Sequence, residues 1–216
     1  INGSMKNIGV IGAGFAGLWS AIAAVRRLDE LSVARDQVSV TLINRDAWHG
    51  IRVRNYESDL SQIRVPLDSV LAPTGVRLIK GEVTAIDPKD RSIVLQSPNG
   101  QQDINYDRLV LAAGSRVFLP GIPGLAEHGL NIDTYNETKK LDLHLKGLSY
   151  QAQSDGWNTV LVIGAGLTGI EIACEMPNRL KAVGIQSGRV ILADRLQHIG
   201  SDIGIHARAV IHRALD

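Results

Sequence analysis

Two clusters of glycine residues are the part of this sequence best suited to binding a cofactor. Both follow the pattern G-x-G-x-x-G, as GAGFAG over residues 12–17 and as GAGLTG over residues 164–169. The first glycine permits a tight strand-to-helix turn, the second lets a pyrophosphate approach the backbone, and the third lets the helix pack closely on the strand. The helix N-terminus then presents free N–H groups to the phosphates. The backbone contacts that we expect involve Gly12, Ala13, Gly14, Phe15, Ala16 and Gly17 in the first cluster and Gly164, Gly166, Leu167, Thr168 and Gly169 in the second.

Glycine also marks plain tight turns, so the elements around each cluster decide the interpretation. Continuous apolar runs predict buried strands, and the small-residue pattern after each cluster predicts a helix. The elements expected are strands at Lys6–Gly12, Val38–Ile43, Thr159–Gly164 and Arg189–Ala193, with helices from Phe15 to about Leu31 and from Leu167 onward. Each cluster therefore joins a strand to a helix in a β-α-β unit. A structural turn without nucleotide is the alternative at each cluster.

An acidic residue is expected where the second strand of a dinucleotide-binding unit ends, because it binds ribose hydroxyls. In the second unit this residue is Asp194, whose carboxylate would accept from an adenosine 2′-hydroxyl and repel a 2′-phosphate. The carboxylate therefore favours NADH over NADPH, although the adjacent Arg195 would attract the 2′-phosphate of NADPH. The first unit has Asn44 followed by Arg45 at this position. An amide can still bond a ribose hydroxyl, but it has no charge.

Between the two units the pattern changes to short strands separated by turn residues. These strands are expected at Val76–Lys80, Val83–Ile86, Ser92–Gln96 and Asp103–Tyr106. Turn chemistry such as Asp87-Pro88 separates them, so they predict an antiparallel meander inserted into a parallel sheet. Arg108–Ala113 returns to a continuous apolar run, whereas residues 46–66 are polar and read as irregular. Pro66–Leu71 is consistent with a short helix.

The chain is expected to divide at Leu119–Gly124, where proline and glycine stop both helix and ladder. We therefore predict an α/β protein with two Rossmann-like dinucleotide-binding units and an inserted antiparallel β-meander. The domains would span residues 5–122 and 123–216, with residues 1–4 before Met5 read as a cloning remnant. Helices are expected at Thr134–Gln153 and Asp202–Ala214, and Pro177 should kink the second-unit helix or end it near Met176.

The second unit offers only two clear parallel strands, which bury helices poorly. We therefore expect a truncated chain, the N-terminal half of a longer protein. The alternative is that a second copy supplies the missing strands in a homodimer.

Composition limits the other functional classes. The net charge of +1 and the scattered basic residues argue against nucleic acid as a partner. Cys174 is the only cysteine, which excludes an intrachain disulfide or redox pair and favours a reducing compartment, the cytoplasm. We interpret it as a small buried helix residue. No apolar run reaches the roughly 18 residues that a membrane span needs. The histidines, His49 among them, show no ligand spacing with carboxylates or cysteine, so no metal site is expected.

Three motifs in this order resemble the two-dinucleotide-binding flavoproteins, which include the pyridine nucleotide-disulfide oxidoreductases and type II NADH dehydrogenases. They are IGVIGAGFAGLWSA near the start, YDRLVLAAGS at Tyr106–Ser115, and VLVIGAGLTGIEIA in the second unit. The region after the first β-α-β unit lacks the cysteine pair of the disulfide reductases. The stretch IRVPLDSVLAPTGVRLIKGEVTAID resembles type II NADH dehydrogenases instead.

This resemblance implies FAD on the first unit, NADH on the second, and hydride transfer from NADH to the flavin, with an acceptor such as a quinone. It implies that Val83 contacts the FAD adenine through its backbone and that Ala113 and Gly114 lie near the phosphates or ribityl chain. Glu171 would lie near the nicotinamide–flavin stack and is the candidate catalytic residue. A place on the first turn of a helix would also explain Glu171, through the helix dipole. The resemblance further implies a longer parent attached peripherally to a membrane, and the alternative function is a dinucleotide-binding fragment without turnover.

Overall fold

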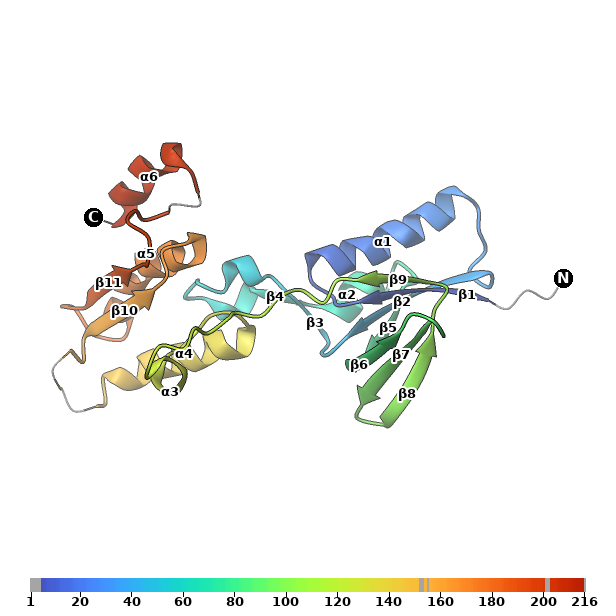
Figure 1. Ribbon diagram of the computed structural model, residues 1–216, viewed down its shortest axis with the longest axis horizontal. Helices are drawn as coiled ribbons and strands as arrows, with labels where there is room; N and C mark the ends of the chain where they lie inside the picture. The colour runs from blue at the N-terminus through green and yellow to red at the C-terminus, as the bar shows by residue number, and fades with distance from the viewer. Residues whose placement is uncertain (1–4, 152–153, 155, 201–202, 216) are drawn as a thin grey trace. The chain divides into compact units, whose positions relative to one another are not determined.

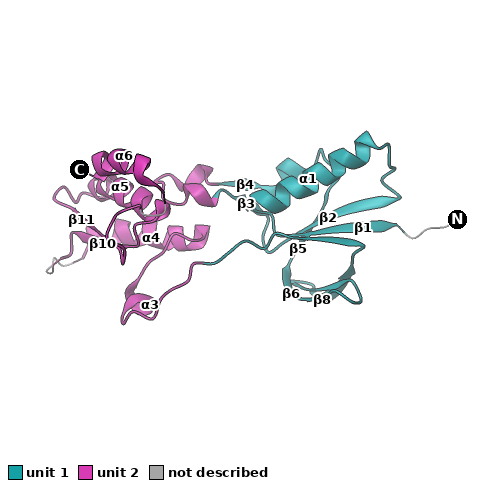
Figure 2. Cartoon of the chain, turned by 45° about the horizontal axis from the view of Figure 1, so that its top comes forward, with its two compact units in different colours: residues 1–51, 64–116 teal, residues 52–63, 117–216 magenta. Residues whose placement is uncertain are grey.

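The computed structural model describes residues 5–151, 154, 156–200 and 203–215 (Figure 1). The residues read as a cloning remnant, 1–4, lie outside the described part. The chain forms two compact units (Figure 2): one contains residues 64–116 and those up to 51, and the other contains residues 52–63 and 117–216. The binding domains predicted over residues 5–122 and 123–216 stay a prediction.

The first unit is built on a four-stranded parallel sheet in the order β5-β2-β1-β9. Its strands are β1 (Lys6–Ile11), β2 (Val38–Asn44), β5 (Arg77–Lys80) and β9 (Arg108–Leu111). Alternate side chains face opposite sides of the sheet, as the strand period requires. Val10 packs in the core that holds helix α1 (Phe15–Glu30), whereas Ile11 packs with Ile93 of the meander. The sheet therefore has a helix on one face and β-strands on the other, as Figure 1 shows.

The antiparallel meander consists of β6 (Glu82–Asp87), β7 (Ser92–Ser97) and β8 (Gly100–Asn105). One expectation was wrong here, because Val76–Lys80 was assigned to the meander. Arg77–Lys80 instead form β5, which pairs in parallel with β2, so that Leu42 lies opposite Leu78. The short helix α2 (Leu67–Leu71) precedes β5, and Val76 is buried with the α1 core, so the chain enters the parallel sheet before it turns into the meander.

Residues 46–66 are more ordered than the sequence suggested, so the irregular interpretation was wrong. Strands β3 (Trp48–Gly50) and β4 (Arg64–Pro66) pair antiparallel, and 3-10 turns occupy Arg52–Arg54 and Leu60–Gln62. Strands of three residues are too short to show a period of two. Residues 52–63 pack with the second unit, where the Asn55 side chain donates to the Ile132 carbonyl at 2.9 Å.

The second unit contains a two-stranded parallel sheet of β10 (Thr159–Ile163) and β11 (Arg189–Ala193). Helix α5 (Leu167–Ala182) packs on it, and Ile172, Met176 and Leu180 form its core with Val162. The remaining helices are α3 (Leu125–His128), α4 (Tyr135–Leu148) and α6 (Ile205–Leu215). The predicted ends of α4 at Gln153 and of α6 at Asp202 fall on residues outside the described part.

Of the two effects expected at Pro177, an end of α5 near Met176 is wrong, because the helix runs through Pro177 to Ala182, and a kink stays a prediction. Proline removes one intrahelical hydrogen bond and crowds the preceding turn. Met176, Arg179 and Leu180 are all buried on the same helix. Their burial offsets the loss, since tertiary packing of an apolar face supplies most helical stability in proteins.

Candidate functional site

The first glycine loop connects β1 to α1, and two of its glycines are required by close backbone approach. Gly12 has a φ of +95°, and a Cβ on it would lie 2.2 Å from the Ala112 carbonyl oxygen. A Cβ on Gly17 would lie 1.8 Å from the Gly12 carbonyl oxygen. These positions exclude any side chain, because such distances are far below van der Waals contact. The loop is also tied to the sheet by the Gly12 N–H, which donates to the Ile43 carbonyl at 2.8 Å.

Gly14 is different, because a Cβ on it would meet nothing within 4 Å. Its backbone is extended, with φ −68°, and it is the N-cap residue of α1 without a side-chain hydrogen bond. The first N–H groups of a helix have no intrahelical acceptor and carry the positive end of its dipole. No acidic residue lies in the first turn of α1, and Phe15 and Ala16 are exposed there. The loop thus combines open space with unpaired donors, which is what a phosphate needs.

Asn44 joins the end of β2 to this loop. Its Oδ1 accepts from the Ala13 N–H at 3.0 Å, and its Nδ2 donates to the Asp46 carbonyl at 3.1 Å. An amide oxygen has two lone pairs, so one is still available for a ribose hydroxyl. Arg45, next along the chain, is exposed.

His49 is the residue at this loop that sequence reasoning missed. It lies on β3, is only 7% exposed, and its Nδ1 is 2.7 Å from the Ala13 carbonyl oxygen. Its ring meets the Phe15 ring edge to face, with centroids 4.8 Å apart. The sequence held no signal for this contact, because it depends on where the short β3–β4 pair places residue 49. Among the described residues, no group of three histidine, cysteine or acidic side chains is suited to a metal ion.

The residues expected near the flavin come from the meander and from the end of β9. Ala113 and Gly114 follow β9 and are exposed, and the Ala113 Cα lies beside Gly12, 3.3 Å from the position of a Cβ there. Val83 lies on β6 opposite Leu95. The start of β6 is close to the end of β2, since the Gly81 N–H donates to the Asn44 carbonyl at 2.9 Å. The first unit thus gathers Asn44 and Ala113 at its glycine loop.

The second glycine loop repeats the backbone plan of the first. Gly164 has a φ of +103°, and its N–H donates to the Ala193 carbonyl at 2.8 Å. A Cβ on Gly169 would lie 1.8 Å from the Gly164 carbonyl oxygen. Gly166 is the extended N-cap residue of α5, with φ −72°. Leu167 and Thr168 are exposed at the start of that helix.

Asp194 occupies the position in the second unit that Asn44 occupies in the first. Its Oδ2 accepts from the Ala165 N–H at 2.6 Å and its Oδ1 from the Leu196 N–H at 2.7 Å. The Ala165 bond first, and the Leu196 bond next, lower the pKa of the Asp194 carboxyl. The group is therefore ionised at neutral pH and keeps lone pairs for ribose hydroxyls. Arg195 beside it is exposed.

Glu171 and Cys174 lie further along α5. Glu171 is the fifth residue of the helix, so its expected place on the first turn was wrong, and no acidic residue lies there. Partial burial raises the pKa of the Glu171 carboxyl and of the Cys174 thiol. The Cys174 Sγ lies 3.5 Å from the Ala214 carbonyl oxygen, and the residue is partly rather than fully buried.

Residues 6–216 match the pyridine nucleotide-disulphide oxidoreductase family. The chain belongs to this family. It is 48% identical over 215 residues to the NADH dehydrogenase-like protein of Mycobacterium tuberculosis strain CDC 1551, covering 98% of this chain and 53% of that protein. It is 32% identical to the demethylphylloquinone reductase of Synechocystis, covering 85% of this chain and 47% of that protein. The expected family and the resemblance to NADH dehydrogenase-like proteins are thereby confirmed.

The fold is similar to that of NDH2 from Plasmodium falciparum in complex with NADH, with a TM-score of 0.74 and 15% identity. That match covers 97% of this chain and 46% of the other. It confirms two Rossmann-like units with an inserted meander. The chain spans about half the length of the curated relatives it matches. No helix among the described residues combines the length and the apolar character that crossing a bilayer requires.

Proposed function

We propose that this chain holds both cofactors of an FAD-dependent NADH oxidoreductase, with FAD on the first glycine loop and NADH on the second. The observation that supports this most is the repetition of one backbone plan. Each loop has a left-handed first glycine, an extended and uncapped second glycine, and a third glycine against the carbonyl of the first. In each loop the first and third glycines are required by the backbone itself, and the second stands at the helix N-terminus, where a phosphate would approach the free N–H groups.

The first loop offers FAD a phosphate cradle at residues 12–17, with open space beside Gly14. Asn44 and Arg45 would bind the adenosine ribose, and the Val83 backbone would contact the adenine. Ala113 and Gly114 would lie along the phosphates or ribityl chain, since the end of β9 reaches Gly12. When bound, the flavin supplies an acceptor for the hydride of NADH and passes the electrons to a further acceptor.

The second loop offers NADH the backbone of residues 164–169. The ionised Asp194 would accept from the 2′-hydroxyl of the adenosine ribose and would repel a 2′-phosphate, which favours NADH over NADPH. Arg195 is exposed beside it and would offset part of that preference. Glu171 would lie near the nicotinamide and tune the field there, because it is a partly buried carboxyl on the helix that begins at this loop.

We further propose a quinone as the electron acceptor and a peripheral place on the membrane for the longer parent. Two relatives are named for quinone chemistry, the demethylphylloquinone reductase and the type II NADH:quinone oxidoreductase of Staphylococcus haemolyticus. A cysteine pair is not needed as an intermediate carrier, and the chain has only Cys174.

The visible spectrum of the purified chain tests this function. We expect oxidised flavin bands that bleach when NADH is added without oxygen, and that bleach less with the same concentration of NADPH. Flavin bands that do not respond to either donor would favour the second candidate, dinucleotide binding without turnover, which the half-length match supports. A colourless chain that takes up no FAD would contradict the assignment of the first loop.

A further inference from the structure

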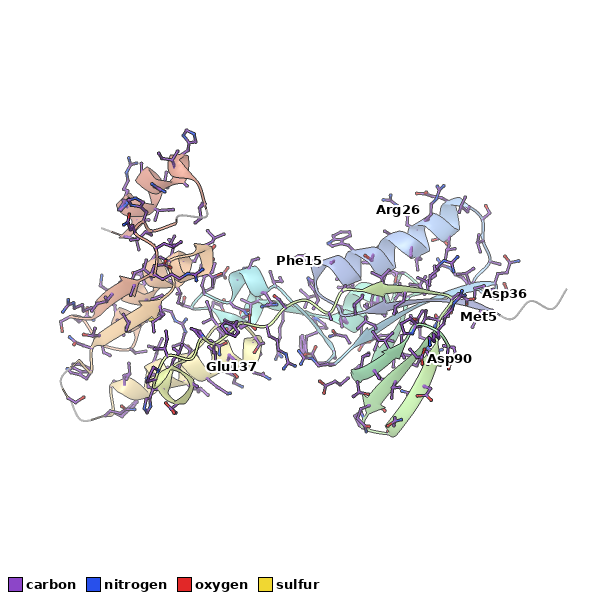
Figure 3. The ribbon with its side chains drawn as sticks, in the orientation of Figure 1. Met5, Phe15, Arg26, Asp36, Asp90 and Glu137 are labelled. Atoms are coloured by element: carbon purple, nitrogen blue, oxygen red, sulfur yellow. The ribbon has the colours of Figure 1, made fainter. Side chains whose placement is uncertain are left out.

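His49 comes to the first glycine loop from outside the β-α-β unit that forms the loop. It lies on β3, opposite Val65 of β4, and its side chain is almost fully buried. On the loop it touches two residues on either side of Gly14: its Nδ1 faces the Ala13 carbonyl, and its ring meets Phe15. Phe15 is the first residue of α1, labelled in Figure 3 at the end of the helix that meets the loop.

The contact with Ala13 is a hydrogen bond in which His49 must be the donor. A carbonyl oxygen only accepts, so Nδ1 carries the hydrogen. Both the neutral ring with its hydrogen on Nδ1 and the doubly protonated ring donate in this way. The bond at 2.7 Å is therefore compatible with either charge state of the ring.

Both backbone groups of Ala13, the N–H and the carbonyl, form hydrogen bonds with side chains. Its N–H donates to Asn44 Oδ1 at 3.0 Å, and its carbonyl accepts from His49 at 2.7 Å. The carbonyl of Ala13 and the N–H of Gly14 belong to one planar trans peptide, so they point in opposite directions. Fixing the carbonyl therefore fixes the direction of the Gly14 N–H. No acceptor for that N–H is found among the described residues, and the space beside Gly14 is open.

The second loop holds the corresponding carbonyl without a side chain. The Ala165 carbonyl accepts from the backbone N–H of Gly200 at 3.1 Å. The first loop thus depends on one imidazole for a contact that the second makes through its backbone. A substitution of His49 should affect only the first loop.

We propose that His49 is a positioning residue that locks the peptide between Ala13 and Gly14 and aims the Gly14 N–H at the phosphates of the dinucleotide. Its bond also polarises that peptide, which makes the N–H a better donor. This inference rests on the proposed binding of a dinucleotide, FAD, at the first loop. His49 itself does not touch the cofactor.

Two variants separate this role from simple packing. His49→Leu keeps an apolar side chain against Phe15 but removes the donor, whereas His49→Asn keeps a donor near the place of Nδ1. His144→Leu is the matched control, because His144 is exposed on α4 of the second unit. Each variant of the 216-residue chain is labelled with 15N, and the amide shift of Gly14, the dissociation constant for FAD and that for NADH are measured.

We expect His49→Leu to move the Gly14 amide shift and to weaken FAD binding about tenfold, the effect of losing one buried hydrogen bond. His49→Asn should restore most of both, and NADH binding and the His144→Leu control should stay unchanged. The proposal is overturned if the Gly14 shift does not move in His49→Leu, or if the Leu and Asn variants lose FAD equally. If the unsubstituted 216-residue chain binds no FAD, that result contradicts the proposed function but not the role of His49. The Gly14 amide shift still reports whether His49 fixes the loop.

Discussion

The two glycine loops share one backbone and differ in the side chains that hold it. In both, the first glycine donates to the neighbouring strand at 2.8 Å and the residue after it donates to a side chain at the strand end. In the first loop that side chain is the neutral Asn44, and a second tie comes from His49. In the second it is the charged Asp194, and the second tie is the Gly200 backbone.

The difference separates binding of the phosphates from binding of the ribose, which the sequence pattern contains together. The backbone conformation that we propose for phosphate binding is repeated in the two loops. The residue at the strand end differs in charge, since it is the neutral Asn44 in the first loop and the carboxylate of Asp194 in the second. With the proposed function, the two loops would bind the same chemical class, a dinucleotide, and would still distinguish between members of that class.

The largest effect is expected where the two loops are the same. Gly17→Ala and Gly169→Ala should each destabilise the chain by about 3 kcal/mol, because the new methyl group would lie 1.8 Å from a backbone carbonyl oxygen. Urea unfolding measures this. Gly14→Ala is the control, since its methyl group meets open space and its φ suits any residue, so it should change stability by less than about 1 kcal/mol. Equal effects at Gly14 and Gly17 would mean that the loop can relax around a side chain.

A smaller effect is expected where the loops differ in charge. Asp194→Asn should reduce the preference for NADH over NADPH about tenfold, or about 1.4 kcal/mol, because the carboxylate no longer repels the 2′-phosphate. Dissociation constants for both donors measure it. The matched change Asn44→Asp in the first loop should leave this preference unaltered. If the ratio of the NADH and NADPH dissociation constants is unchanged in Asp194→Asn, Asp194 does not determine the choice between these donors.

The smallest effect is expected when the pH is lowered until the Asp194 carboxylate is protonated. The pKa of Asp194 is lowered from its ordinary value of 3.8 by the bonds from Ala165 and Leu196. A carboxyl with a lowered folded pKa stabilises the structure fully above its unfolded pKa, and loses this contribution as the pH falls through the folded value. In the chain without ligand, the Ala165 amide shift should therefore change between about pH 5 and about pH 2. The Ala13 amide should change less, because Asn44 does not titrate. Asp194→Asn should abolish the change at Ala165, and its persistence there would assign the titration to another group.

Much of this comparison could be predicted from the sequence. The glycines, the strands around them and the two residues at the strand ends follow from local patterns, because each β-α-β unit is contiguous in the chain. What could not be predicted depends on contacts between distant residues. His49 reaches Ala13 from β3, which pairs with β4, and the Asn55 side chain donates to the distant Ile132 carbonyl of the second unit.

Two further errors have the same physical origin. An end of α5 near Met176, one of the two effects expected at Pro177, followed from a local rule, but the helix continues to Ala182 because Arg179 and Leu180 are buried. The assignment of Val76–Lys80 to the meander followed from its short length, whereas its partner β2 lies far back in the chain. In both cases tertiary packing determines where the element ends or which strand it pairs with, and the local sequence does not.

The division of labour between the loops is tested most directly by Gly14→Val and Gly166→Val, with flavin content and anaerobic reduction by NADH measured on both. Both positions are extended N-caps, so valine is compatible with the backbone, and its side chain would lie where the proposed phosphate approaches. We predict that Gly14→Val loses its flavin, whereas Gly166→Val keeps its flavin and is no longer reduced by NADH. Equal loss of flavin in the two variants, or flavin retained in Gly14→Val, would contradict the assignment of FAD to the first loop and NADH to the second.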